Sequence, residues 1–219
     1  GLDLGLDKTA WDWTVPGWKI DLVLELRSRL VYGAKFERWL HLARKAYRAL
    51  YNGPSLILSD GRVFRQCYTG IMKSGCVNTI ADNSFMQIVD HILVCQDQAV
   101  KFYPLPRAVG DDTLQSSKQV TDLLGYSKYG AIVKSATEGL EFVGMDFKVT
   151  GPEPIYFEKH LFKMPYMGAV LVDYMDAMLR MYVYSPRFYL WEQLANRLGV
   201  GKYMRSRAYY LSWYEYGFD

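Results

Sequence analysis

The sequence predicts an α+β fold, with strands and helices mixed up to Met164-Pro165 and mostly helix after that point. Residues 2–7 alternate leucine with glycine or aspartate, which is the period of a strand and sets Asp7 on the face opposite the leucines. Apolar residues recur at helical spacing over 79–95 and again over 170–198. These patterns place the strands early in the chain and a helical segment at its end.

Turn and boundary signals divide the mixed part into short elements. Thr14-x-Pro16 opens a helix, Gly33 separates it from a second helix, and Asn52-Gly53-Pro54 ends the second. Asp60-Gly61 predicts the turn of a hairpin. The expected elements after residue 54 are strands over 55–58 and 62–68, a helix over 79–95, strands over 107–109 and 113–114, a helix from Ser116 or Ser117 to about Gly130, and strands over 131–134, 140–149 and 155–162.

Composition indicates a folded and only mildly basic chain. Of its 219 residues, 50% are hydrophobic and 16% aromatic, which is enough for a real core and argues against disorder. The 26 lysines and arginines exceed the 23 acids by a net charge of +3, and a purely electrostatic nucleic-acid binder is usually more basic. Charge alone therefore does not indicate RNA binding.

Cysteine and histidine usage suggests neither a disulfide framework nor a zinc site. The 3 cysteines are an odd number, which fits a reducing compartment, and the 3 histidines lack zinc-ligand spacing. No apolar run approaches the roughly 18–20 residues of a membrane span, and Gly1 starts no signal-peptide pattern. Because the chain opens in the middle of a strand-like pattern, we expect it to be a fragment or processed piece.

The motif Gly110-Asp111-Asp112 predicts a metal-binding hairpin tip. Hard divalent cations prefer carboxylate oxygens, and a tight strand-turn-strand exposes both side chains. Alone the motif is weak, because it arises by chance in roughly one chain in twenty of this length. Glycine and aspartate are also common turn formers.

A second and more specific motif is Ser74-Gly75-x3-Thr79-x3-Asn83. Gly75 allows the backbone to bend or to approach a ligand closely, and Thr79 and Asn83 share one face of the helix that follows. Their hydroxyl and amide groups can read a sugar hydroxyl. Simple helix capping by Ser74 and Thr79 is the alternative.

Asp7-x4-Asp12 completes an ordered trio. Pairs of acids at this spacing are common on protein surfaces, so the motif gains its weight from the strand before Asp7 and from its place ahead of the other two. Joint occurrence in this order is rarer than about one in ten thousand chains. The trio therefore favours a catalytic origin over chance.

The three motifs resemble motifs A, B and C of positive-strand RNA virus RNA-dependent RNA polymerases. The segments Trp11–Val15 and Gly70–Gly75 are most similar to sobemovirus-like and polerovirus-like enzymes, and the resemblance covers roughly Gly1–Phe147. It implies a right-hand polymerase with its fingers largely missing. The palm, an antiparallel sheet backed by helices with motifs A to E and an insert between A and B, would occupy 1–165, and a mostly helical partial thumb 166–219.

The resemblance also implies a two-metal site. Carried over by position, Asp7 and Asp111 would hold two Mg²⁺ ions, with Mn²⁺ as a substitute and Asp112 as a supporting acid. One metal would activate the primer 3′-hydroxyl and the other would stabilise the pyrophosphate. Lys134, at the place of the motif D lysine, would protonate pyrophosphate, and an ordinary exposed lysine is the alternative.

Nucleotide recognition follows from the same resemblance. Asp12 and Asn83, helped by Thr79, would bind the ribose 2′-hydroxyl. Ser74 and Gly75 would form the flexible loop near the template and the nucleotide.

The end of the chain carries weaker signals. Phe142–Phe147 resembles the primer-grip hairpin, motif E, although an aromatic strand is often simply core. Basic residues among tyrosines over 180–207 fit a thumb that tracks the RNA backbone, and they fit equally an ordinary helical face with arginines reaching into solvent.

The leading hypothesis is template-directed RNA synthesis by a catalytic fragment of a viral replicase. A reverse transcriptase shares the palm, but Asp12 and Asn83 suit a 2′-hydroxyl; a non-catalytic RNA-binding domain is the third reading, and the intact acids argue against it. The implied partners are RNA template and primer or product, nucleoside triphosphates, the missing fingers segment of the same polyprotein, and other replicase proteins. The family further implies a membrane-associated replication complex in the host cytoplasm. Without fingers, we expect the isolated chain to polymerise little or nothing.

Overall fold

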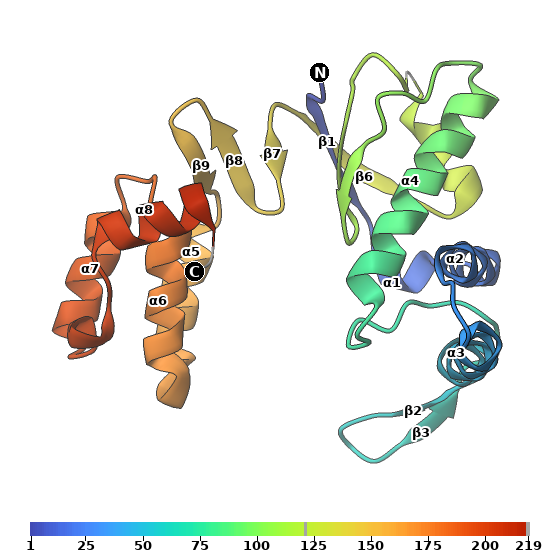
Figure 1. The fold of residues 1–219 in the computed structure, drawn as a ribbon, viewed down its shortest axis with the longest axis horizontal. Helices are drawn as coiled ribbons and strands as arrows, with labels where there is room; N and C mark the ends of the chain where they lie inside the picture. The colour runs from blue at the N-terminus through green and yellow to red at the C-terminus, as the bar shows by residue number, and fades with distance from the viewer. Residues whose placement is uncertain (121, 218–219) are drawn as a thin grey trace. The chain divides into compact units, whose positions relative to one another are not determined.

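The computed structural model describes residues 1–120 and 122–217 and divides into two compact units, Gly1–Gly139 and Leu140–Asp219 (Figure 1). Each unit has its own hydrophobic core. The predicted boundary between palm and thumb, at 165/166, concerns the function of the two parts and differs from this division into compact units. It stays a prediction.

The first unit is an α+β unit built around one sheet (Figure 1). Its elements are β1 (Leu4–Lys8), α1 (Trp11–Thr14), α2 (Gly17–Leu30), α3 (Phe36–Tyr51), β2 (Ser55–Ile57), β3 (Val63–Arg65), α4 (Thr79–Asp97), β4 (Arg107–Val109), β5 (Asp112–Gln115), the 3₁₀ helix η1 (Leu123–Tyr129) and β6 (Val133–Glu138).

The four-stranded sheet has the order β4-β5-β1-β6, and every neighbouring pair is antiparallel. Leu4 and Leu6 of β1 are buried in one core with Met86 and Val94 of α4. Asp7 lies on the exposed face, because strand residues alternate between the two sides. The predicted direction of Asp7 is therefore confirmed.

A buried carboxylate joins three helices of the first unit. Asp82 on α4 is 1% exposed and accepts hydrogen bonds from Arg27 Nε on α2 at 2.6 Å and from the Tyr47 hydroxyl on α3 at 2.8 Å. Asn78 Nδ2 donates to the same carboxylate at 2.6 Å. Removing a partner from such a group leaves a buried charge without compensation, so Asp82 holds α2 and α3 against α4.

The second unit pairs a small sheet with a helical part (Figure 1). Its elements are β7 (Glu141–Phe142), β8 (Met145–Lys148), β9 (Gly151–Pro154), α5 (Phe157–Lys163), the 3₁₀ helices η2 (Met164–Tyr166) and η3 (Gly168–Val170), α6 (Leu171–Met181), α7 (Phe188–Arg197), the 3₁₀ helix η4 (Gly201–Tyr203) and α8 (Arg207–Tyr216).

The helical part of this unit closes around large apolar and aromatic side chains. Met175, Tyr182 and Trp191 are fully buried, and the rings of Tyr182 and Trp191 lie 5.5 Å apart between centroids. Aromatic pairs at that separation add to the free energy gained from burial alone. The helices expected after Met167 are confirmed.

Two of the expected elements are wrong. The run 155–162 is read as a strand, but Phe157 begins α5, because Phe157, Leu161 and Met164 recur at helical spacing and pack against the core of the second unit. No helix starts at Ser116 or Ser117, since the Ser117 amide and hydroxyl bind Asp3 at 2.8 and 2.9 Å instead of capping.

The helical turn expected after these serines begins later. It starts after Asp122, whose side chain accepts from the Leu124 amide, and it ends at Gly130 as predicted. Position 121, inside the expected helix, lies outside the described residues. The single strand expected over 140–149 is instead the hairpin of β7 and β8, because Val143 and Gly144 turn the chain with positive φ, and β9 covers Gly151-Pro152, where a break was expected. The remaining predicted elements are present, with boundaries moved by a few residues.

Candidate active site

Strand pairing brings the first and third acidic motifs together. The pairs Leu4↔Gln115, Gly5↔Leu114 and Leu6↔Thr113 align β1 with β5, and one further step in the same register sets Asp7 opposite Asp112. Directly opposed residues of antiparallel strands typically have Cα atoms about 4.5–5.5 Å apart. The acids therefore meet at one end of the sheet although the chain separates them widely.

Asp111 lies in the two-residue turn between β4 and β5. Val109 pairs with Asp112, which leaves Gly110 and Asp111 at the tip, and Gly110 adopts a positive φ of 66°. Glycine reaches that conformation without the steric cost that a Cβ adds. Asp7, Asp111 and Asp112 are all exposed, so a ligand from solvent can reach them.

The donor set suits a site that substrate completes. Within residues 1–120 and 122–217, no group of three or more His, Cys, Asp or Glu side chains is arranged to hold a metal ion. Mg²⁺ is commonly held by only one or two carboxylates, with water and substrate phosphates filling its other positions. Two exposed carboxylates on neighbouring strands fit that kind of coordination.

Lys134 reaches the same place through an irregularity of β6. Asp7 pairs with Ser135 but Lys8 pairs with Val133, so Lys134 is the extra residue of a β-bulge. Its ammonium donates to Asp7 Oδ2 at 3.2 Å. Bulges re-aim side chains, and here the result is an exposed ion pair of little worth to stability.

The second acid of the first motif meets the middle motif. Asn83 Nδ2 on α4 donates to Asp12 Oδ1 at 3.2 Å, and the Ser74 hydroxyl donates to the other Asp12 oxygen. The amide of Met72 donates to the Asp12 carbonyl at 2.7 Å and holds this loop against α1. We call Asp12, Ser74 and Asn83 the Asp12 cluster.

The side-chain oxygen of Asn83 is a buried acceptor. The residue is 3% exposed, and within the described part of the chain its Oδ1 atom has no hydrogen-bond partner. Buried polar atoms are normally satisfied, so an acceptor without a partner beside the half-buried Asp12 carboxylate is a candidate contact for a ligand hydroxyl. The Thr79 hydroxyl donates to the Lys73 carbonyl at 2.7 Å, which shapes the loop before α4, and its predicted help in ribose binding stays a prediction.

The glycines of the middle loop differ in their surroundings. A Cβ on Gly75 would meet nothing within 4 Å, which agrees with room left for a ligand. A Cβ on Gly70, where φ is +135°, would lie 2.5 Å from the Val15 carbonyl oxygen. Sequence reasoning gave Gly70 no role, and its role here is to let the loop approach the segment after α1.

Buried charges lie beneath the sheet. Lys19 of α2 and Asp90 of α4 form an ion pair of 2.6 Å with no exposed side-chain surface. Burial lowers the pKa of Lys19, and it raises the pKa of Asp90 to about 6 although Lys19 opposes the rise. Burial likewise lowers the pKa of Lys8 to about 8, against the pull of Asp90.

Sequence reasoning missed Lys8. It is 5% exposed, and its ammonium donates to Thr113 Oγ1 at 2.7 Å. The alternation along the strand could have predicted its burial, because residues 4, 6 and 8 of a strand point to the same face and Leu4 and Leu6 are apolar.

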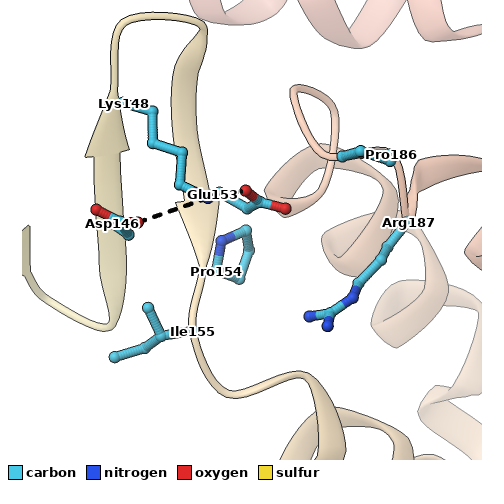
Figure 2. Close-up of a pocket in the computed structure, with 7 residues that line it drawn as sticks. All are labelled: Asp146, Lys148, Glu153, Pro154, Ile155, Pro186 and Arg187. Carbon is cyan, nitrogen blue, oxygen red and sulfur yellow. Dashed lines mark hydrogen bonds and ion pairs between the residues drawn. The ribbon is translucent and has the colours of Figure 1, made fainter.

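A pocket of about 340 Å³ lies in the second unit (Figure 2). Figure 2 shows Lys148 between Asp146 and Glu153 on the hairpin side, with Arg187 facing them. Lys148 Nζ lies 2.5 Å from Glu153 and 3.6 Å from Asp146, so its charge is already matched. None of the predicted site residues lines this pocket.

Solved structures with a similar fold are viral polymerases. Two structures of the RNA-dependent RNA polymerase of a human picobirnavirus match 91% of this chain, and the chain covers 44% of each. The polymerase matches with a TM-score of 0.65 at 16% identity, and its insertion-loop deletion mutant with 0.62 at 15%. At such identities the likeness shows the α+β fold of a polymerase.

Sequence comparison names the relatives. Over 159 residues the chain is 30% identical to protein P1-P2 of Potato leafroll virus, a match that takes in 72% of this chain and 14% of that protein. Protein P2-P3 of Poinsettia latent virus gives 30% over 162 residues, with 73% and 14% covered. The RNA-directed RNA polymerase of Mushroom bacilliform virus gives 28% over 167 residues, with 72% and 39% covered.

The chain is therefore a region related to viral RNA-dependent RNA polymerases, homologous to part of these proteins, and the predicted resemblance is confirmed. It spans between 14% and 39% of the length of these relatives. No protein-family model matches it.

Proposed function

We propose that this chain is the palm and part of the thumb of an RNA-dependent RNA polymerase, and that it adds ribonucleotides to an RNA 3′ end under the direction of an RNA template. The observation that carries the proposal is the register of β1 against β5: continued by one step, it puts Asp7 opposite Asp112, the neighbour of the turn residue Asp111, at an exposed sheet end. Kinship with viral polymerases supports the same reading.

In this proposal Asp7 and Asp111 hold the catalytic cations, Mg²⁺ or Mn²⁺, and Asp112 supports them. The bound cations would supply Lewis-acid activation of the attacking hydroxyl and neutralisation of charge on the leaving pyrophosphate. Lys134 Nζ lies 3.2 Å from Asp7 Oδ2, where it could donate a proton to a leaving pyrophosphate oxygen.

The Asp12 cluster would select ribose. Asn83 Oδ1 is an acceptor for the 2′-hydroxyl proton, and Asp12 and Ser74 offer further hydrogen-bonding oxygens on the same side. A site built to bind a hydroxyl rejects the analogue that lacks it, because its buried polar atoms are then left unpaired. The cluster therefore favours a polymerase that incorporates ribonucleotides.

The partners proposed are RNA template and primer, nucleoside triphosphates, the remaining part of the polymerase and other replicase proteins. We place the complete protein in a membrane-associated replication complex of the host cytoplasm. No helix within the described part of the chain combines the length and apolar character that crossing a bilayer requires.

The decisive experiment replaces Asp111 by asparagine in the complete polymerase and measures nucleotide incorporation. We expect a loss of about 1000-fold or more, since a metal ligand supplies several kcal/mol of transition-state stabilisation. Asp97→Asn is the matched control, because Asp97 forms an exposed ion pair with Lys128 at the end of α4. Unchanged turnover in Asp111→Asn would refute the metal assignment.

Two alternatives are separated by simple measurements. A reverse transcriptase would prefer deoxyribonucleotides, whereas the Asp12 cluster predicts preference for ribonucleotides and loss of that preference in Asn83→Ala. A non-catalytic RNA-binding domain would bind RNA with no Mn²⁺ signal that depends on Asp7.

A further inference from the structure

Lys8 is a buried charged residue in the strand that carries Asp7. It lies on the buried face of β1 with Leu4 and Leu6, and it is 5% exposed. Burying an ammonium costs free energy that an apolar side chain of similar length does not. Burial by itself therefore favours an apolar residue at this position.

The hydrogen bond from Lys8 crosses between the two strands of the site. Nζ donates to Oγ1 of Thr113, which is 4% exposed, at 2.7 Å. Lys8 directly follows Asp7, and Thr113 directly follows Asp112. Because the strands are antiparallel, Lys8 lies one step beyond Asp7 and Thr113 lies one step toward the paired part of the sheet from Asp112, so the bond crosses diagonally from strand to strand past these two acids.

This bond lies where the backbone pairing of β1 with β5 stops. The paired residues of β1 and β5 end at Leu6↔Thr113, just short of the acids. β1 stays paired with β6 as far as Lys8↔Val133, but on the β5 side its paired residues end here, so the ladder fixes the separation from β5 less closely beyond this point. A buried side-chain hydrogen bond at that point adds a constraint.

Charges from neighbouring elements also act on the Lys8 ammonium. Asp90 on α4 and the two hairpin acids, Asp111 and Asp112, favour its charged form, and Lys19 on α2 opposes it. The Tyr126 ring centroid lies 6.0 Å from Nζ. The cation is within electrostatic reach of the hairpin, where it offsets repulsion between carboxylates at the same sheet end.

We propose that Lys8 is a positioning residue of the polymerase site: through Thr113 it fixes Asp7 beside Asp111 so that both carboxylates reach the same cations. The inference rests on the proposed function. Lys8 touches neither the substrate nor the metals, and it acts through the strand that it holds.

The test is a double-mutant cycle with a readout besides activity. Lys8→Met, Thr113→Val and the double variant remove one or both partners, and Thr113→Ser keeps the hydroxyl as a matched control. Mn²⁺ affinity of the 219-residue chain is measured by electron paramagnetic resonance, together with its thermal midpoint. Turnover and the half-saturating Mg²⁺ concentration are measured in the complete polymerase.

We expect each single variant to lose about 10-fold or more in Mn²⁺ affinity and in turnover, because a small misplacement of reacting groups costs that much. The double variant should lose no more than the worse single one, since the two residues act as one unit. Thr113→Ser should behave as the wild type. The thermal midpoint of the double variant, which leaves neither partner of the buried bond alone, should stay level or rise.

Wild-type Mn²⁺ affinity and turnover in both single variants would overturn the inference, and so would losses that multiply in the double variant. Should Lys8→Met fail to fold, the comparison of Thr113→Val with Thr113→Ser decides. Equal Mn²⁺ binding by the wild type and Asp111→Asn would instead refute the proposed metal site itself.

Discussion

The cores of the two units differ in the polarity of their buried side chains. Among the described residues, the buried charged and amide-bearing side chains lie in the first unit, while Ser185 is the buried polar residue of the second. The second unit is closed by methionine, leucine and aromatic rings. A unit that needs only stability can be apolar inside, whereas the first unit accepts polar groups near its candidate site.

The polar core of the first unit lies beneath the strands that carry the acids. Lys8 binds Thr113 on β5, and His91 on α4 lies 3.3 Å from Gln115 on the same strand. The Lys19–Asp90 pair adds a charged layer between α2 and α4. The comparison shows that the buried polar side chains named here lie near the candidate site. Their presence in one unit and not in the other is therefore related to the site and not to the size of the core.

The largest effect should come from breaking the polar core. Asp82→Ala removes the carboxylate that Arg27 and Tyr47 share, and it should lower the free energy of unfolding by about 3 kcal/mol because buried partners lose their compensation. Urea denaturation measures the change. Asp97→Ala, at an exposed ion pair, should change little, and equal losses in the two variants would contradict the distinction.

A smaller effect is expected from a polar deletion in the second unit. Tyr182→Phe removes the hydroxyl that lies 2.8 Å from His160 Nδ1 but keeps the ring against Trp191. We expect a loss of about 1 kcal/mol, the usual worth of one neutral hydrogen bond. A loss as large as that of Asp82→Ala in the same urea assay would show that this core, too, depends on its polar groups.

The smallest effect concerns pH. Burial lowers the pKa of His91 below its usual 6.5, so the unfolded chain takes up the proton more readily than the folded one. The stability from neutral His91 is therefore complete above pH 6.5 and is lost as pH falls below it. His91→Gln should flatten the stability curve in that window, and parallel curves for both proteins would refute the assignment.

Local pattern was sufficient for much of the fold. Alternation over 2–7 predicts β1 and the outward direction of Asp7, and helical spacing predicts α4. It was insufficient over 155–162, where aromatic residues suit both a strand and a helix until the core they pack against is known.

The site needed information of longer range. The resemblance to viral polymerases supplied the expectation that Asp7 and Asp111 meet, since no local pattern fixes pairing between distant strands. The bulge at Lys134 comes from a register shift between β1 and β6. The hydrogen bond from Lys8 depends on its side chain pointing to the buried face and on the position of Thr113 in the neighbouring strand. Neither feature can be predicted from the local sequence, because both depend on how distant strands pair.

The most direct test is diffraction from crystals of the complete polymerase grown with Mn²⁺, using its anomalous signal. We predict a Mn²⁺ peak between the carboxylates of Asp7 and Asp111, with oxygens about 2.2 Å from the ion, as hard divalent cations require. A peak elsewhere, or carboxylates too far apart to share an ion, would contradict the account.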